Sequence, residues 1–232
     1  MKTETSKRTR LVVVHALFCA VAYLLMFVLR ISGIGGFLTF DAKDAVIIIA
    51  SMIFGPISGI IIAFTVAFLE MITVSGTGVW GALMNFISSA TFAAVSSVVY
   101  NYFPKIKKRL SGAIIGLSIG SAVTVIVMIL MNLIITPIYT KMPVSVIASM
   151  ILPLLLPFNL IKTILNASIV MLLYKSVSNI LKRSGLVTKT DSSANIRFSK
   201  YTVLVFAISA AIASICAMLL IFTLNGQFTL FK

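Results

Sequence analysis

Long, continuous apolar runs constrain the fold of this chain more than any other feature. A helix needs roughly 20 apolar residues to cross a bilayer, and six runs reach about that length: residues 11–29, 57–74, 80–103, 112–135, 150–180 and 201–224. A shorter run, residues 45–54, covers about half a span and ends at Gly55-Pro56, a pair that interrupts helices. We predict an all-α, polytopic transmembrane bundle. Its six core helices include the short run, and a seventh transmembrane helix follows at the C-terminus.

The amino-acid composition excludes the main alternatives to a helical membrane protein. Hydrophobic residues make up 60% of the chain and charged residues 10%, against about 25% charged residues in soluble domains. A water-soluble globule would lack polar surface, and a disordered chain would not carry so much apolar sequence. A transmembrane barrel needs short strands that alternate polar and apolar residues, whereas these runs are uninterrupted.

The basic residues flank the apolar runs and predict an orientation. With the N-terminus inside and every run crossing, including the short one, fourteen Lys and Arg fall inside and four fall outside (Arg30, Lys43, Lys141 and Lys232). Cytoplasmic segments carry such an excess, so residues 1–10, the turn at 105–109 and a linker at 184–200 are predicted to be cytoplasmic. The formal net charge of +14 then reflects topology anchors and lipid-headgroup contacts, and we expect no nucleic-acid partner.

Residues for standard catalysis are scarce. The chain has one histidine, His15, and two cysteines, Cys19 and Cys216, which both lie inside apolar runs. It contains neither a phosphate-binding G-x-x-x-x-G-K-[ST] loop nor an H-E-x-x-H motif. We therefore expect no enzymatic activity, no metal site and no bound cofactor, and an intramembrane enzyme is the less favoured alternative.

Polar residues inside the apolar runs indicate a binding site. An ionisable side chain at mid-span costs roughly 2.5–3.5 kcal/mol and usually faces a cavity or a partner. Glu70, Asn159 and Lys162 are the main cases, and Asn132 and Asn85 add amides in or near apolar runs. Asn159 and Lys162 are three residues apart, so a helix places them on one face. We predict that Asn132, Asn159 and Lys162 form the polar floor of a pocket near the outer face; alternatively, the Lys162 ammonium extends to the membrane interface.

The glycine-rich segment 33–44 is predicted to be a structured outer loop. Its glycines permit tight turns, and Phe40 supplies an aromatic face beside Leu38. Asp41 and Asp44 flank the start of the short helix at about Lys43, where carboxylates accept hydrogen bonds from free N–H groups. We favour this capping role for the two carboxylates over direct contact with a ligand.

Ala16 and Ala20 form a small-xxx-small pair on the first predicted helix. Two small residues four positions apart let another helix approach closely. We predict that they dock a partner subunit; the alternative is that both alanines pack inside the bundle.

Several short motifs, taken in order, resemble a known family. They are F-L-T-F-D-A-K-D at 37–44, F-G-P at 54–56, G-V-W-G-A-L-M-N-F at 78–86, M-N at 131–132 with T-P-I-Y at 136–139, and L-P-F-N-L-I-K at 156–162. Together they resemble the riboflavin-specific S components of energy-coupling factor (ECF) transporters, over about residues 12–183. Ala82 stands where relatives often carry an acidic residue, and residues 181–232 extend beyond the usual six-helix core.

The resemblance implies a substrate-binding subunit that captures riboflavin at the outer face of the plasma membrane. It divides the chain into a cytoplasmic segment (1–10), a six-helix membrane domain (11–183), a linker (184–200) and an additional helix (201–224). It further implies a transmembrane coupling subunit and two ATP-hydrolysing subunits as partners, with Ala16 and Ala20 in the docking face. The expected riboflavin contacts are Leu38, Thr39, Phe40, Asn85, Asn132, Tyr139, Asn159 and Lys162. The alternatives are an S component for another vitamin or flavin-like molecule, and a stand-alone membrane facilitator.

Overall fold

The computed structural model describes residues 2–34, 37–74, 76–183, 200–222 and 227–228. The helices are α1 (Lys2–Val28), α2 (Lys43–Phe54), α3 (Pro56–Thr73), α4 (Gly78–Tyr102), α5 (Leu110–Thr140), α6 (Val144–Ser149), the π-helix η1 (Ile151–Leu155), α7 (Leu156–Arg183) and α8 (Lys200–Phe222). Three short strands accompany them: β1 (Arg30–Ile34), β2 (Leu38–Asp41) and β3 (Gln227–Phe228). The linker predicted at 184–200 lies almost entirely outside the described residues.

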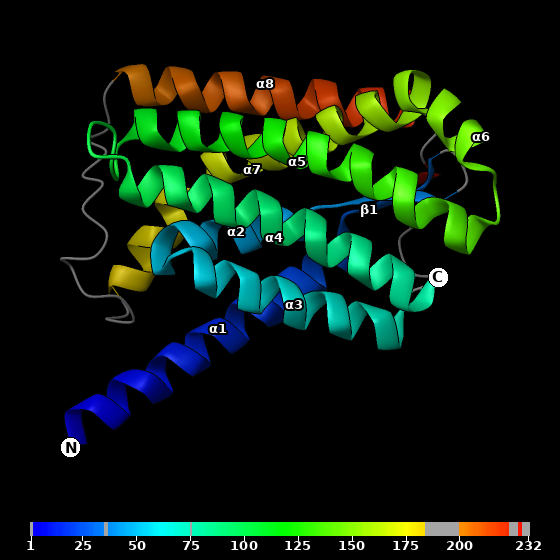
Figure 1. The fold of residues 1–232 in the computed structure, drawn as a ribbon. Helices are drawn as coiled ribbons and strands as arrows, with labels where there is room; N and C mark the ends of the chain where they lie inside the picture. The colour runs from blue at the N-terminus through cyan, green and yellow to red at the C-terminus, as the bar shows by residue number, and fades with distance from the viewer. Residues whose placement is uncertain (1, 35–36, 75, 184–199, 223–226, 229–232) are drawn as a thin grey trace.

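The predicted helical transmembrane bundle is confirmed. In the described part of the chain, six helices are long and apolar enough to cross a membrane: α1, α3, α4, α5, the η1–α7 unit and α8. Helix α5 packs along α4, and α8 packs along α7, while α1 crosses the bundle obliquely and its N-terminal part extends away from the other helices (Figure 1). The predicted additional helix at the C-terminus is α8.

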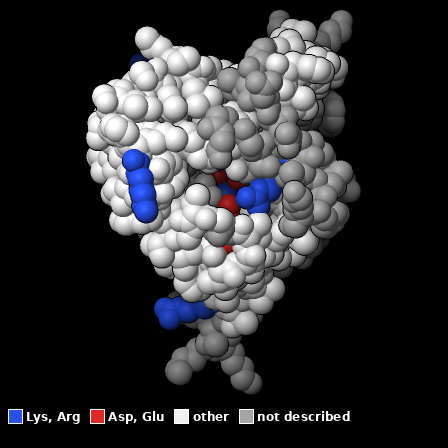
Figure 2. Space-filling model, turned by 90° about the vertical axis from the view of Figure 1, so that its right-hand side faces the viewer, with Lys and Arg blue, Asp and Glu red and all other residues white. Residues whose placement is uncertain are grey.

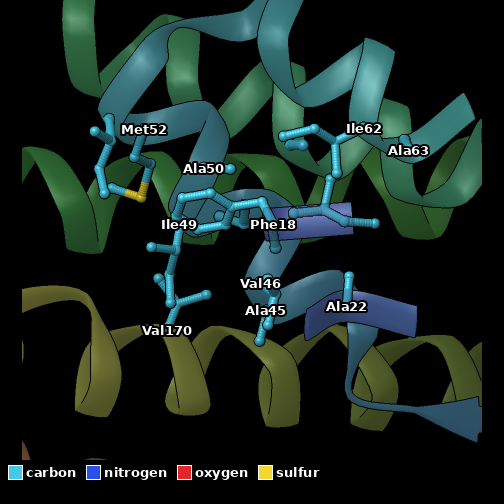
Figure 3. Packing of buried hydrophobic residues seen from close by; sticks show 14 of the residues in the cluster. Phe18, Ala22, Ala45, Val46, Ile49, Ala50, Met52, Ile62, Ala63 and Val170 are labelled. Atoms are coloured by element: carbon cyan, nitrogen blue, oxygen red, sulfur yellow. The ribbon is translucent and has the colours of Figure 1, made fainter. Parts of the chain in front are cut away.

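The short helix α2 forms the centre of the bundle. Every residue from Lys43 to Ile53 is buried, and α2 contacts α1, α3, α4 and α7. Its apolar side chains pack against Phe18 of α1, Ile62 of α3 and Val170 of α7 (Figure 3). A helix that is apolar on all sides is stable only when it is enclosed, which explains why a run of half the usual length is retained here.

Glycine and proline set several helix boundaries as the sequence predicts. Gly55 has φ 101° and separates α2 from α3, whose first residue is Pro56; glycine adopts this left-handed conformation without steric cost. The helix that contains the apolar run 112–135 does not end with that run. Helix α5 continues through Pro137 to Thr140, and α6 occupies most of the remaining segment.

A small sheet covers one end of the bundle, where the sequence predicts a structured outer loop without strands. The strand order is β2-β1-β3, with both pairings antiparallel. The β1–β2 hairpin follows α1 and leads directly into α2. The sheet therefore lies at the end opposite the turn between α4 and α5 that contains the 105–109 basic cluster (Figure 1).

Candidate substrate-binding site

A cavity of about 280 Å³ lies at the sheet-bearing end of the bundle. This volume is close to the lower end of the ~300–1,000 Å³ range of small-molecule sites. Figure 2 shows that face of the molecule, with acidic and basic side chains gathered in a central hollow and a mostly uncharged surface around it. The cavity is lined by the β1–β2 hairpin, the end of α3, the start of α4, the end of α5 and the start of α7.

The structure brings seven of the eight predicted contact residues to this cavity. Its lining includes Leu38, Thr39, Asn85, Asn132, Tyr139, Asn159 and Lys162. The polar floor is buried, because Asn132, Asn159 and Lys162 are 1%, 3% and 6% exposed. Burial of this kind requires that each polar group has a hydrogen-bond partner or faces a ligand.

The two buried amides are held by their own helices and keep hydrogen-bonding capacity for a ligand. Asn132 donates from Nδ2 to the carbonyl oxygen of Met128 (2.7 Å), and its Oδ1 accepts from the Thr136 hydroxyl (2.9 Å). Asn159 donates from Nδ2 to the carbonyl oxygen of Leu155 (2.7 Å), and its Oδ1 accepts no hydrogen bond from the described residues. Each amide nitrogen carries two hydrogens, so one donor on each side chain remains available.

Lys162 is buried rather than extended to the membrane interface. Its ammonium lies 3.6 Å from Oδ2 of Asp44, and Asp44 also accepts a hydrogen bond from the Ser89 hydroxyl. The cavity thus contains an ammonium whose charge is already balanced. Its donors can serve a neutral acceptor without an additional counter-ion.

A second ion pair lies beside the first and corrects two predictions. Lys43 is 1% exposed rather than an anchor in an outer loop. Its Nζ lies 3.0 Å from Oδ2 of Asp41 and 2.7 Å from Oε2 of Glu70, which itself lines the cavity. Asp41 accepts the backbone N–H of Lys43 only at 3.3 Å, and neither Asp41 nor Asp44 is the N-cap of α2. Asp41 and Asp44 therefore serve mainly as ion-pair partners of Lys43 and Lys162, because a buried ammonium needs such a partner.

The same ion pairs control the protonation of Asp41. Burial alone would raise the pKa of this carboxyl group. The ammonium groups of Lys43 and Lys162 outweigh that effect, and the pKa of Asp41 lies below its usual value. Asp41 is therefore ionised at neutral pH and holds the hairpin to the start of α2.

Asn166 is a structural residue that the sequence motifs do not single out. Its Oδ1 accepts the backbone N–H of Ala45 (3.0 Å), which satisfies one of the free donors at the start of α2. Its Nδ2 donates to the carbonyl oxygens of Lys162 (3.1 Å) and Asp41 (3.4 Å). One amide thus joins α2, α7 and the hairpin. The available signal was that Asn166 lies four residues after Lys162, on the same face of one helix.

The structure does not bring Phe40 to the cavity. Phe40 is 3% exposed and packs with Phe158 and Leu165 of α7. The aromatic rings that line the cavity together with Tyr139 are those of Phe37 and Phe158.

Ala16 and Ala20 lie on the outer surface of α1. Both are exposed, whereas their neighbours Val14 and Phe18 are buried in the core. The alternative that both alanines pack inside the bundle is therefore wrong. Their exposure leaves a small-residue stripe available to another helix.

Three comparisons relate the chain to known proteins. A family model described as "ECF transporter, substrate-specific component" matches residues 10–174. The riboflavin transporter RibU of Staphylococcus aureus (strain TCH60) is 30% identical over 185 residues, which cover 78% of this chain and 97% of that protein. A solved structure described as "Structure and mechanism of the S component of a bacterial ECF transporter" is 28% identical with a TM-score of 0.64, and the match covers 76% of this chain and 99% of that one.

Proposed function

The chain belongs to the substrate-specific components of ECF transporters, and on that premise we propose that its cavity captures riboflavin for import. The observation that carries the proposal is the convergence of Asn132, Asn159 and Lys162 on one cavity in a chain similar to a riboflavin transporter over most of its length. The coupling subunit and the ATP-hydrolysing subunits of the family would supply the energy for transport.

The chemistry of the cavity suits this ligand. Riboflavin combines a flat apolar ring system, a uracil-like edge and a polyhydroxyl tail. An asparagine amide has both a donor and an acceptor and can match the uracil-like edge, and the Lys162 ammonium donates to a carbonyl or hydroxyl oxygen. Phe37, Leu38 and Phe158 supply apolar surface for the ring.

The charge of the cavity also favours a neutral molecule. The ammonium groups of Lys43 and Lys162 pair with Asp41, Glu70 and Asp44, and Arg30 in the cavity lining brings the basic groups to three against three carboxylates. A ligand with its own net charge would have to displace these partners or leave a charge uncompensated, which is costly in a buried site.

The location of the cavity fits capture from outside the cell. We place the protein in the plasma membrane with the N-terminus and the 105–109 turn in the cytoplasm, because most of the basic residues lie in segments on that side. The cavity lies at the opposite end of the bundle, beside the sheet. Ala16 and Ala20 would form part of the surface that docks on the coupling subunit.

A titration with a matched control tests the ligand and the site together. Riboflavin is added to the purified protein and the quenching of flavin fluorescence is followed for wild type, Asn159→Ala and Asn179→Ala. Asn179 lies on the same helix and is exposed, so its substitution should leave binding unchanged. Loss of the Asn159 amide should weaken binding by about 1–3 kcal/mol. Equal affinities for wild type and Asn159→Ala would contradict the assigned site, and absence of binding by wild type would favour another vitamin.

A further inference from the structure

The C-terminal part of the chain contacts the cavity hairpin although it lies outside the family match. That match ends at residue 174, before α8 and β3. Helix α8 packs along α7 and returns the chain to the sheet-bearing end (Figure 1). There β3 pairs with β1 on the edge opposite β2, in a backbone register that pairs Phe228 with Ile31 and Gln227 with Ser32.

Side-chain packing strengthens this connection. Cys216 and Leu220 lie one helical turn apart on α8, and they are 6% and 0% exposed. They belong to an apolar cluster with Ile31, Ile34 and Phe40 of the hairpin and with two residues of α7, Phe158 and Leu165. The other sides of α8 are mainly exposed, so this face is the one that the fold uses.

The cluster touches the cavity directly. Phe158 belongs to the cluster and also lines the cavity, and Leu38 packs against the cluster from the cavity lining. A movement of the hairpin away from α8 would therefore change the cavity wall. A two-stranded hairpin alone is only marginally stable, and a third strand with an apolar face adds the support that it lacks.

We propose that α8 and β3 form a C-terminal brace that holds the β1–β2 hairpin against the cavity and slows the release of the bound ligand. The brace supports the β1–β2 hairpin through strand pairing at β3 and through apolar packing at Cys216 and Leu220. The choice of riboflavin as the probe rests on the proposed function, whereas the brace itself rests on contacts within the chain.

Two independent pairs of full-length variants test the brace. Leu220→Ala removes packing at the buried face of α8, and Leu204→Ala is its control because Leu204 is 56% exposed on the same helix. The double variant Gln227→Pro/Phe228→Pro removes the backbone N–H groups of β3. The corresponding double alanine variant keeps them while losing the same side chains. Each protein is loaded with riboflavin and diluted rapidly, and the recovery of flavin fluorescence gives the dissociation rate.

The brace predicts dissociation on the order of tenfold faster in Leu220→Ala and in the double proline variant, and within about twofold of wild type in the two controls. A rate within about twofold of wild type in both brace variants overturns the proposal, as does equal acceleration in the controls. If one brace variant does not fold, the other pair decides.

A measurement without ligand separates the brace from the identity of the ligand. Thr39→Cys places a thiol on the cavity wall, and its labelling rate is measured with and without Leu220→Ala, after subtraction of the labelling of the buried Cys19 and Cys216. Faster labelling with Leu220→Ala supports the brace even if wild type binds no riboflavin. An unchanged labelling rate overturns it.

Discussion

Lys43→Met is expected to destabilise the protein strongly. The buried ammonium of Lys43 lies 3.0 Å from Asp41 and 2.7 Å from Glu70. Methionine fills much of the volume but leaves both carboxylates without their cation. Removal of one partner from a buried ion pair costs about 3–5 kcal/mol. For a chain of this size, at about 2–4 °C per kcal/mol, the melting temperature should fall by about 6–20 °C.

Glu70→Gln tests whether the unpaired carboxylates cause the loss of stability in Lys43→Met. It preserves the pair between Lys43 and Asp41 and leaves an amide oxygen where the carboxylate oxygen was, so its cost should be only about 1–2 kcal/mol. In the Lys43→Met background the same substitution removes an uncompensated negative charge. The double variant should therefore be more stable than Lys43→Met alone, a coupling that neighbouring charged residues are expected to show.

The assay uses the two cysteines of the protein. Both Cys19 and Cys216 are buried, so a thiol-reactive dye reports unfolding of the detergent-purified protein during heating. A melting temperature of Lys43→Met within about 3 °C of wild type, which is about 0.8–1.5 kcal/mol on the same scale, would refute this role of the ion pair. It is also refuted if adding Glu70→Gln to Lys43→Met lowers the melting temperature further.

Three other predictions follow from packing, exposure and charge. Gly116→Ala places a Cβ 2.8 Å from a backbone oxygen of α4, so thermal melting should show a loss of about 1–3 kcal/mol; unchanged melting would show that the two helices separate freely. Ala16→Trp and Ala20→Trp should abolish riboflavin uptake by cells containing the partner subunits but leave binding by the purified protein intact, and unchanged uptake would exclude the docking role. On intact cells an impermeant thiol reagent should label Lys141→Cys but not Lys107→Cys, and the reverse pattern would invert the orientation.

The helical spans could be predicted because the lipid bilayer imposes them on the sequence. A bilayer requires long apolar runs, and these are visible in one dimension. The sequence does not predict the strands of the hairpin because β1 and β2 are short, because β1 contains Gly33, and because β1 is stabilised by a strand almost 200 residues later in the chain. A contact of that kind has no local signature.

In the candidate site too, local spacing predicts some contacts, whereas contacts between distant segments are not predicted. Asn159 and Lys162 share a helix face, and their spacing alone placed them together. Lys43 was assigned to an outer loop because its partner Glu70 lies on a different helix, 27 positions later, and the sequence does not show that the two meet. Phe40 was expected at the cavity because an aromatic ring suits a flat ligand, but its ring is used in the packing of β2 against α7.

The flavin content of the purified protein tests the central claim most directly. Wild type and the double variant Asn159→Ala/Lys162→Ala are expressed in cells supplied with riboflavin, purified in detergent without added ligand and then denatured. The flavin released is measured by absorbance against protein concentration. The structure predicts a yellow wild-type protein with about one riboflavin per chain, bound in the cavity lined by Asn159 and Lys162, and little flavin in the double variant. A colourless wild-type protein, or equal flavin in both proteins, would contradict the account.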